Sequence, residues 1–280
     1  MPPIAFFERE SSDLFVPTRF ARSLWAPQTL SGPPVCAIAA RAAETEFCPE
    51  GFRGARFTIE LFKAAREIPT TTRGRMSRDG GRIKVVEVDV VQDFDGVETV
   101  VARSTSVFVK ETSNPPGDRW IPADDDFRPP TAGSDDLFPW FGSDDENGEP
   151  AWDQTIGNHQ NARRKRMWTR AVWTVAGERP SPFERAVISG ESTSLMGNWG
   201  STGIGFINCD LTVGLSRLPD GPRIGLEAVS HTESDGISTS TTHLYDIHGQ
   251  FGVGLVTGLN NAAAEIDFTS VDTTDRYTEA

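Results

Sequence analysis

The amino-acid sequence predicts an α+β protein made of two tandem repeats, each with a central helix wrapped by an antiparallel sheet. Two observations carry this prediction. Helix-start signals stand 150 positions apart, at Ser31 and Ser181. Each predicted helix is followed by long stretches in which β-branched residues alternate with polar ones, as in strands with one buried face. The chain has 280 residues, which is enough for two such units.

The two predicted helices begin in similar ways. In the first, Ser31 precedes Gly-Pro-Pro and the alanine-rich stretch VCAIAARAAE. In the second, Ser181 and Glu184 form a capping box with proline in the first turn, followed by RAVISGESTSLM. A short polar residue before proline is a helix start in both repeats.

Strand-like segments follow both helices in the same register. ARFTIELFKAAREIP ends at Pro69, and FINCDLTVGLSRLP ends at Pro219, 150 positions later. Upstream of the helices, ARSLW at 21–25 matches TRAVW at 169–173. These matches indicate an internal duplication.

Long strands joined by tight turns are predicted after each of these prolines. Alternating segments occupy the rest of both repeats and are interrupted by Gly-containing pairs typical of β-turns. These pairs are Asp79-Gly80, Asp95-Gly96, Asp235-Gly236 and His248-Gly249.

A segment rich in Pro, Gly and Asp separates the repeats. It covers residues 113–150 and is predicted to be a linker between an N-terminal repeat (1–112) and a C-terminal repeat (151–280). Ten acidic residues against two arginines give it a charge of −8, most of the net charge of −13. Its five aromatic residues indicate that parts of it lie against the folded surface.

Composition excludes several classes of function. A net charge of −13 argues against nucleic-acid binding, which needs a basic surface. Three widely spaced cysteines without a CxxC pair argue against disulfides and zinc, and no metal or cofactor is expected. No apolar run is long enough for membrane insertion, and the first residues lack the pattern of a secretory signal. A cytoplasmic location is therefore expected.

The order of elements resembles the double-hotdog form of the hotdog fold, and three short stretches resemble the acyl-CoA thioesterase II-like superfamily. Ser189-Gly190-Glu191 stands where the family's second repeat carries an acid after two small residues. Asn208 lies two positions before Asp210, as a polar strand residue does in the family. Gly249 and Thr257 reproduce the spacing from a turn glycine to a polar residue on the last strand.

This resemblance implies hydrolysis of an acyl-CoA to the free acid and coenzyme A. It places Glu191, Asn208 and Thr257 in the catalytic positions, where the family has Asp, Thr or Ser, and Gln. The substitutions keep polar groups at all three positions, and they also fit an altered substrate or a weakened site.

Glu191 is the most informative residue. On the predicted helix it shares a face with Val187, Ile188 and Leu195, so the buried face carries a carboxylate. Burial raises the pKa of a carboxyl group toward the range of a general base at neutral pH. The alternative is that Glu191 lies at the helix edge and pairs with an arginine. The first repeat has Arg41 at the equivalent position, so the second repeat is predicted to be the catalytic one.

In the predicted mechanism Glu191 takes a proton from water, which Asn208 and Thr257 hold by hydrogen bonds. Asn208 and Thr257 are equally compatible with ordinary polar residues at strand ends. Asp210 and His231 are predicted to support the site, or to be structural.

Basic residues near both repeats are candidates for the phosphates of coenzyme A. Alternatively, the run around Arg163 balances the acidic linker. The candidates are Lys63, Arg66, Arg163 and Arg164.

Two other functions fit the sequence. One is a non-catalytic module that binds an acyl-CoA or lipid. The other is a hotdog hydratase or dehydratase, which needs an Asp–His pair such as Asp210 with His231. One chain supplies both copies of the fold, so a monomer is feasible, while the family resemblance also allows a homodimer of such units.

Overall fold

The structure is a computed structural model that describes residues 4–120, 127–131, 138–273 and 276. The strands of the first repeat are β1 (Ala5–Arg9), β2 (Leu14–Pro17), β3 (Phe52–Leu61), β4 (Thr70–Asp79), β5 (Ile83–Phe94) and β6 (Val97–Lys110). Those of the second are β7 (Trp140–Asp144), β8 (Pro150–Asp153), β9 (Lys165–Arg170), β10 (Trp173–Val175), β11 (Phe206–Asn208), β12 (Asp210–Leu215), β13 (Arg223–Ser234), β14 (Ile237–Asp246) and β15 (Gly249–Asn260). The helices are α1 (Gly32–Phe47), α2 (Pro182–Glu191) and α3 (Thr193–Asn198), with short 3-10 turns at Arg19–Ala21, Ile156–His159 and Ala262–Ala264.

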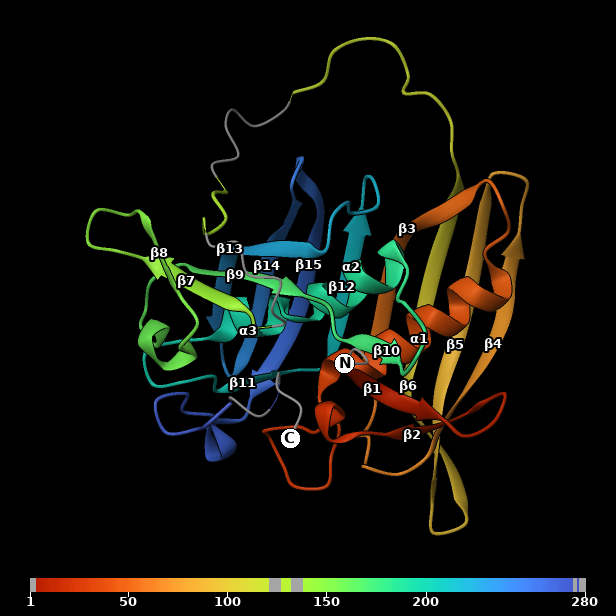
Figure 1. The fold of residues 1–280 in the computed structure, drawn as a ribbon, viewed down its shortest axis with the longest axis horizontal. Helices are drawn as coiled ribbons and strands as arrows, with labels where there is room; N and C mark the ends of the chain where they lie inside the picture. Colours follow the sequence, from red (N-terminus) through yellow and green to blue (C-terminus); the bar gives the residue numbers. More distant parts are fainter. Residues whose placement is uncertain (1–3, 121–126, 132–137, 274–275, 277–280) are drawn as a thin grey trace.

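All the described strands belong to one continuous sheet. Its order is β10-β1-β2-β4-β5-β6-β3-β12-β15-β14-β13-β9-β7-β8, with β11 beside β15 (Figure 1). The repeats join where β3 pairs antiparallel with β12, and Glu60 lies opposite Asp210, its counterpart 150 positions later. At the other end, β1 of the first repeat pairs in parallel with β10 of the second. The two repeats therefore share a sheet and cannot be separated without breaking strand pairs.

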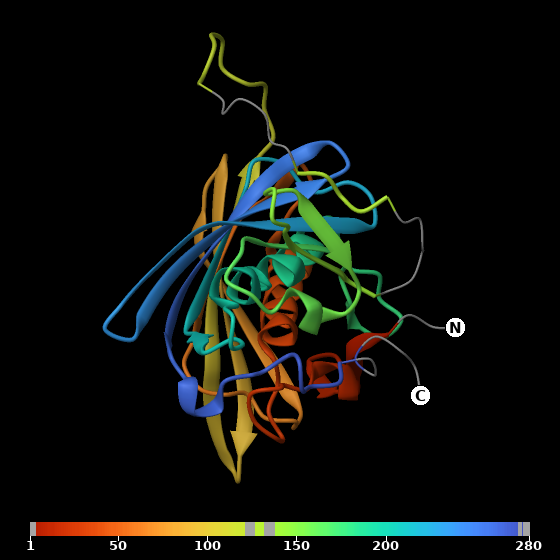
Figure 2. The same ribbon diagram turned by 90° about the vertical axis from the view of Figure 1, so that its left-hand side faces the viewer.

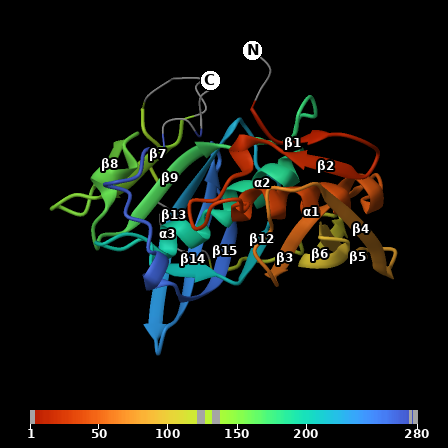
Figure 3. The same ribbon diagram turned by 90° about the horizontal axis from the view of Figure 1, so that it is seen from below.

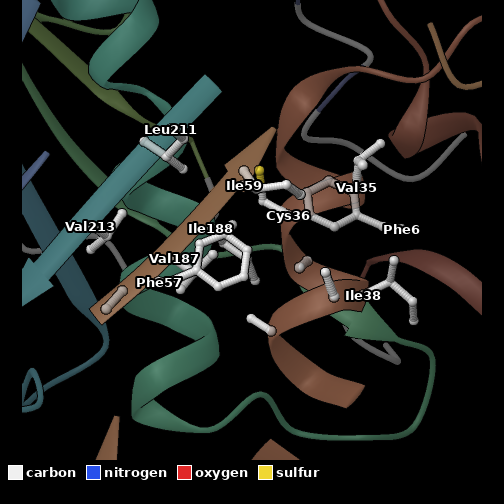
Figure 4. Packing of buried hydrophobic residues seen from close by; sticks show 14 of the residues in the cluster. Phe6, Val35, Cys36, Ile38, Phe57, Ile59, Val187, Ile188, Leu211 and Val213 are labelled. Carbon is white, nitrogen blue, oxygen red and sulfur yellow. The ribbon is translucent and has the colours of Figure 1, made fainter. Parts of the chain in front are cut away.

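Helices α1 and α2 lie side by side within the curved sheet. Figures 2 and 3 show α1 and α2 on its concave side. The core between them and the central strands is made of buried aliphatic and aromatic side chains, several of which are labelled in Figure 4. They include Ile38 of α1, Val187 of α2, Phe57 and Ile59 of β3, and Val213 of β12. The prediction of a helix wrapped by strands in each repeat is confirmed.

The helix starts differ in how they are capped. The capping box of α2 is present, with Ser181 Oγ accepting from the Glu184 N–H at 3.0 Å. Ser31 makes no side-chain capping bond to α1, although proline occupies the first turn of both helices. Because Pro33 and Pro34 have no N–H, Gly32 carries the one N–H of this turn that is left for another partner.

The second predicted helix and the strand after it are interrupted. The helix was expected to run through RAVISGESTSLM, but α2 ends at Glu191 and α3 begins at Thr193. Serine, threonine and glycine are weak helix formers, which explains the break. The Thr193 hydroxyl also bonds Thr242 of β14 at 2.7 Å and directs α3 toward the sheet. The following segment is divided at Cys209 into β11 and β12.

The predicted linker is shorter than the composition suggested. Residues 140–144 lie inside the range 113–150, yet they form β7, which pairs with β8 and β9. The sequence Trp-Phe-Gly-Ser fits a strand because the glycine admits the Trp152 ring against its backbone. Phe127 stacks on Tyr245 with ring centroids 4.4 Å apart, whereas Trp120 is 87% exposed. Only some of the segment's aromatic residues pack on the surface.

Among the described residues, no helix has the length and apolar character needed to cross a membrane.

Candidate active site

Glu191 lies at the point where the two repeats meet. It is the last residue of α2, 8% exposed, and its carboxyl group contacts the first residue of α1. A Cβ atom built on Gly32 would lie 1.9 Å from Glu191 Oε1. Only glycine therefore fits at this position while the carboxyl group stays where it is.

Asn208, at the end of β11, is the polar partner of Glu191. Its Nδ2 donates to Glu191 Oε1 at 3.4 Å and to the Asp210 carbonyl at 3.2 Å. Burial raises the pKa of Glu191 to about 8, and the bond from Asn208 partly opposes this rise. The carboxyl group has no paired cation, so the alternative of an arginine partner at the helix edge does not hold within the described residues.

A hollow of about 610 Å³ opens beside Glu191 and Asn208. We call it the catalytic hollow. Its wall is mainly apolar and combines both repeats, including Trp25, Leu61, Leu195, Ile204, Ile207 and Phe268. A smaller hollow of about 200 Å³ also reaches Glu191, between α2 and β9. A buried carboxyl group beside an apolar cavity of this size is the arrangement expected of a small-molecule site.

Thr257 lies away from this hollow. On β15 the buried residues Val256 and Gly258 flank it, so the side chain of Thr257 points to the opposite face of the sheet. Its backbone N–H donates to Asp210 Oδ1 at 2.5 Å. The structure thus brings Asp210 and Thr257 to each other and does not bring the Thr257 hydroxyl to Glu191.

Two further residues at the site escaped the sequence analysis. Gly32 gives the Glu191 carboxyl group its space, and Ser194 lines the catalytic hollow three residues after Glu191. The spacing of Ser194 along the helical segment was a usable signal, because residues three apart lie on the same side of a helix. The role of Gly32 depends on contact between repeats, which no local pattern reveals.

His231 does not pair with Asp210. Its strand, β13, is separated from β12 by β14 and β15. His231 Nδ1 bonds Ser240 Oγ at 2.9 Å, and Nε2 bonds Glu233 Oε2 at 3.0 Å. The Asp–His pair named for a hydratase is therefore not formed by these two residues.

The four basic candidates lie in two places. Lys63 lines the catalytic hollow, and Lys63 and Arg66 both lie over the Phe94 ring, at 4.1 and 4.8 Å from its centroid. Arg163 and Arg164 line a third hollow, of about 790 Å³, beyond α3. Only the first pair is close to the catalytic hollow.

The equivalent place in the first repeat has different chemistry. Arg41 of α1 donates to Glu178 Oε2 at 2.9 Å, and Arg9 donates to Glu178 Oε1 at 2.8 Å. Arg41 stands 150 positions before Glu191, and it contacts the segment before α2, just as Glu191 contacts the start of α1. The ion pairs with Glu178 therefore lie where the first repeat would have its equivalent of the Glu191 site. Among the described residues, no group of three or more His, Cys, Asp or Glu side chains is placed to hold a metal ion.

Comparison with protein families identifies both halves of the chain. Residues 21–109 match a family described as acyl-CoA thioesterase N-terminal domain, and residues 111–256 match one described as acyl-CoA thioesterase C-terminal domain. No curated protein matches the sequence significantly.

Solved structures confirm the double-hotdog fold at low sequence identity. The tesB protein of Mycobacterium avium subspecies paratuberculosis is 14% identical, with a TM-score of 0.63 over 91% of this chain and 95% of that one. Acyl-CoA thioesterase II TesB2 of Mycobacterium marinum is 12% identical, with a TM-score of 0.61 over 91% and 95%. A hot dog fold protein of unknown function from Alicyclobacillus acidocaldarius is 14% identical, with a TM-score of 0.64 over 91% and 95%.

Proposed function

This chain belongs to the acyl-CoA thioesterase family, and from that membership we propose that it hydrolyses an acyl-CoA to the free acid and coenzyme A at Glu191. The observation that carries the proposal is the buried Glu191 carboxyl group, which has a pKa of about 8 and lies at the wall of an apolar hollow. A carboxyl group with a pKa in this range can take and return a proton near neutral pH.

The reaction needs one activated water molecule. Glu191 accepts a proton from the water while Asn208 Nδ2 orients the carboxyl group and Ser194 offers a hydroxyl in the same wall. The water oxygen bonds to the thioester carbon, and the carbonyl electrons move onto its oxygen. When the carbonyl re-forms, the C–S bond breaks, and the proton held by Glu191 passes to the departing thiolate.

The start of α1 is suited to stabilising the negative charge that develops on the carbonyl oxygen. Gly32 touches the Glu191 carboxyl group, and Ser31 leaves the first turn of α1 without a side-chain cap. Pro33 and Pro34 have no N–H, and the Val35 N–H makes the first bond of the helix to the Ser31 carbonyl, so Gly32 supplies the free donor of this turn. A free N–H group at a helix start can stabilise an oxyanion.

Release of free thiol from acyl-CoA substrates tests the proposal. The parent protein is expected to release coenzyme A, and Glu191→Gln is expected to reduce kcat/KM by about 100-fold or more, the usual contribution of a general base. Glu184→Gln is the matched control, because Glu184 is also a buried glutamate of α2 but does not line the catalytic hollow. Equal activities in the two variants would contradict the mechanism, and a parent that binds acyl-CoA without releasing thiol would identify a binding protein.

Lys63 is the proposed contact for coenzyme A phosphate at this hollow, with Arg66 beside it. Lys63→Gln is expected to raise KM with little change in kcat, because it removes an interaction made equally in ground and transition states.

The three free cysteines suit a reducing compartment, and a cytoplasmic location is proposed on that basis. Light scattering on the purified protein distinguishes a monomer from the homodimer that the family resemblance also allows.

A further inference from the structure

Glu191 lies between two hollows. The catalytic hollow has a volume of about 610 Å³, and the hollow between α2 and β9, which we call the smaller hollow, has about 200 Å³. Most of their lining residues differ. Five residues line both hollows: Ser31, Pro33, Glu191, Leu195 and Arg276. A molecule in either hollow can therefore reach the neighbourhood of the Glu191 carboxyl group.

The linings of the two hollows differ in chemistry. The wall of the catalytic hollow is mainly apolar, whereas the smaller hollow combines apolar side chains with hydroxyl and guanidinium groups. The polar members include Thr169 and Arg170 at the end of β9, Ser192 directly after α2, Ser31 directly before α1, and Arg276. An apolar wall suits the hydrocarbon parts of a thioester, while a bound water molecule needs two to four polar partners.

Ser192 brings an unpaired hydroxyl group to the smaller hollow. This residue joins α2 to α3, and its side chain makes no capping bond to α3. It is half-buried, and its hydroxyl has no hydrogen-bond partner within the described residues. Ser31 Oγ donates to the Ala21 carbonyl at 3.2 Å and keeps its acceptor capacity. Both hydroxyl groups can thus bond water.

One oxygen of the Glu191 carboxyl group is also available. Oε1 accepts from Asn208 Nδ2 at 3.4 Å and faces Gly32, and both of these residues line the catalytic hollow. Oε2 makes no hydrogen bond within the part of the chain that the structure describes, yet it retains accessible surface. Oε2 is therefore the oxygen that can accept a proton from water.

A thioester that fills the catalytic hollow displaces water from it, because closing an apolar site around a substrate expels solvent. The hydrolysis proposed at Glu191 nevertheless consumes one water molecule in each turnover. The smaller hollow offers a polar source of water beside the same carboxyl group. At about 30 Å³ per molecule, its volume corresponds to six or seven water molecules.

We propose that the smaller hollow is a water site that supplies the hydrolytic water, and that Ser192 positions this water. The proposal rests on the hydrolysis proposed above. The thioester occupies the catalytic hollow, and the water molecule bonds both the Ser192 hydroxyl and Glu191 Oε2. The water gives one proton to Oε2 while its oxygen bonds to the thioester carbon, and another water molecule from the smaller hollow then takes its place.

Substitutions that fill one hollow at a time test the proposal. Ala171 lines only the smaller hollow, and Ala64 lines only the catalytic hollow. Ala171→Leu is expected to lower kcat at least tenfold and to leave KM within about twofold, because it excludes water but not the thioester. Ala64→Leu, the matched control, is expected to raise KM instead. The melting temperatures of both variants show whether they are folded. A folded Ala171→Leu protein with the kcat of the parent would overturn the proposal.

Smaller substitutions test the positioning role of Ser192. Ser192→Ala removes one hydrogen bond to the water, so kcat should fall about fivefold while KM stays unchanged. Ser192→Thr keeps a hydroxyl group and should recover most of the parent kcat. Equal kcat values for the two variants would contradict this role.

The length of the acyl chain shows whether the acyl group occupies the smaller hollow instead of water. With water in this hollow, Ala171→Leu lowers kcat by the same factor for acetyl-CoA and hexadecanoyl-CoA. With the acyl chain in it, the loss of kcat/KM is much greater for hexadecanoyl-CoA, and the proposal fails.

A crystal structure of the parent protein with a thioether analogue of an acyl-CoA tests the site without turnover. An ordered water molecule is expected within hydrogen-bond distance of both Ser192 Oγ and Glu191 Oε2. An active parent with no water at this place, or with part of the analogue in the smaller hollow, would refute this proposal alone. A parent that binds the analogue and releases no thiol from acyl-CoA would refute the hydrolysis itself.

Discussion

At the level of single residues, the environment of Glu191 determines the pH at which the site can work. Burial favours the protonated acid, and the hydrogen bond from Asn208 favours the carboxylate. With a pKa of about 8, roughly a tenth of the sites carry the carboxylate at pH 7.

We therefore expect kcat/KM to rise about tenfold per pH unit between pH 6 and 7 and to level off above pH 8. Asn208→Ala removes the bond that lowers the pKa of Glu191, so the midpoint of its profile should move to higher pH. Initial rates of thiol release between pH 5.5 and 9.5 measure both profiles. A flat profile would exclude Glu191 as the base.

A substitution at Gly32 tests whether the position of the Glu191 carboxyl group matters, without changing any charge. Gly32→Ala places a methyl group 1.9 Å from Glu191 Oε1, so the carboxyl group must move. A displacement of this size is expected to lower kcat by about 100-fold. Gly81→Ala is the control, because no atom lies within 4 Å of a Cβ built there. The idea fails if both alanine variants retain full kcat.

At the level of elements, the start of α2 joins two carboxyl groups that are sensitive to pH, through the hydroxyl group of Ser181. Burial raises the pKa of Glu184 to about 7 and also raises that of Glu44. Ser181 Oγ accepts from the Glu184 N–H and donates to Glu44, and Thr174 donates to Glu184 at 2.7 Å. The folded state therefore holds protons that the unfolded chain has released above about pH 4.5.

A carboxyl pKa that is raised on folding stabilises the protein at low pH and loses this effect as pH rises through the folded pKa. For Glu184, stability should fall between about pH 4.5 and 7, by about 3 kcal/mol in total for a shift of this size. Glu184→Gln preserves the capping box and removes this dependence. Urea unfolding at pH 5 and 8.5 measures the free energy of unfolding of both proteins. Relative to the parent, the variant should be more stable at pH 8.5 than at pH 5. The same difference in free energy at both pH values would contradict the assignment.

The elements also show what sequence patterns can predict. The capping box at Ser181, the β-turn pairs and the 150-residue duplication are local or periodic signals, and the structure confirms the elements that they predicted. Thr257 was chosen from the family's spacing, which does not determine the face of β15 on which its side chain lies, because side chains alternate between the two faces of a strand. The strand at 140–144 was missed because its flanking Pro, Gly and Asp residues are typical of loops.

The site itself was only partly predictable. Glu191 and Asn208 follow from helix periodicity and from the family resemblance, and the structure brings them within 3.4 Å. Gly32 belongs to the other repeat, and its role follows from tertiary contact alone. Buried contacts between segments that are distant in sequence leave no periodic signal along the chain.

At the level of the whole molecule, the two repeats are joined by packing and strand pairing more than by the segment between them. β3 pairs with β12, β1 pairs with β10, and α1 packs on α2. Residues near Gly117 are exposed and lie outside every strand and helix. The covalent connection should therefore be dispensable once the chain has folded.

A protease site inserted after Gly117 is expected to allow cleavage into two fragments that stay together and retain at least half of kcat/KM. Gel filtration followed by denaturing electrophoresis measures association, and thiol release measures activity. Expression of residues 151–280 alone should give no activity, because Gly32 and half of the sheet are missing. Separation of the cleaved fragments, or activity in the single repeat, would refute this account.

The stretch of chain that borders both the catalytic and the third hollow also bears on how this protein can evolve. Leu259 and Asn261 line the catalytic hollow, whereas Asn260 and Ala262 line the third hollow. A mutation at Leu259 alters one lining, whereas a mutation at the next residue alters the other. Substitutions at adjacent codons can thus change the lining of one hollow with little effect on the other, so the two linings can diverge in separate steps.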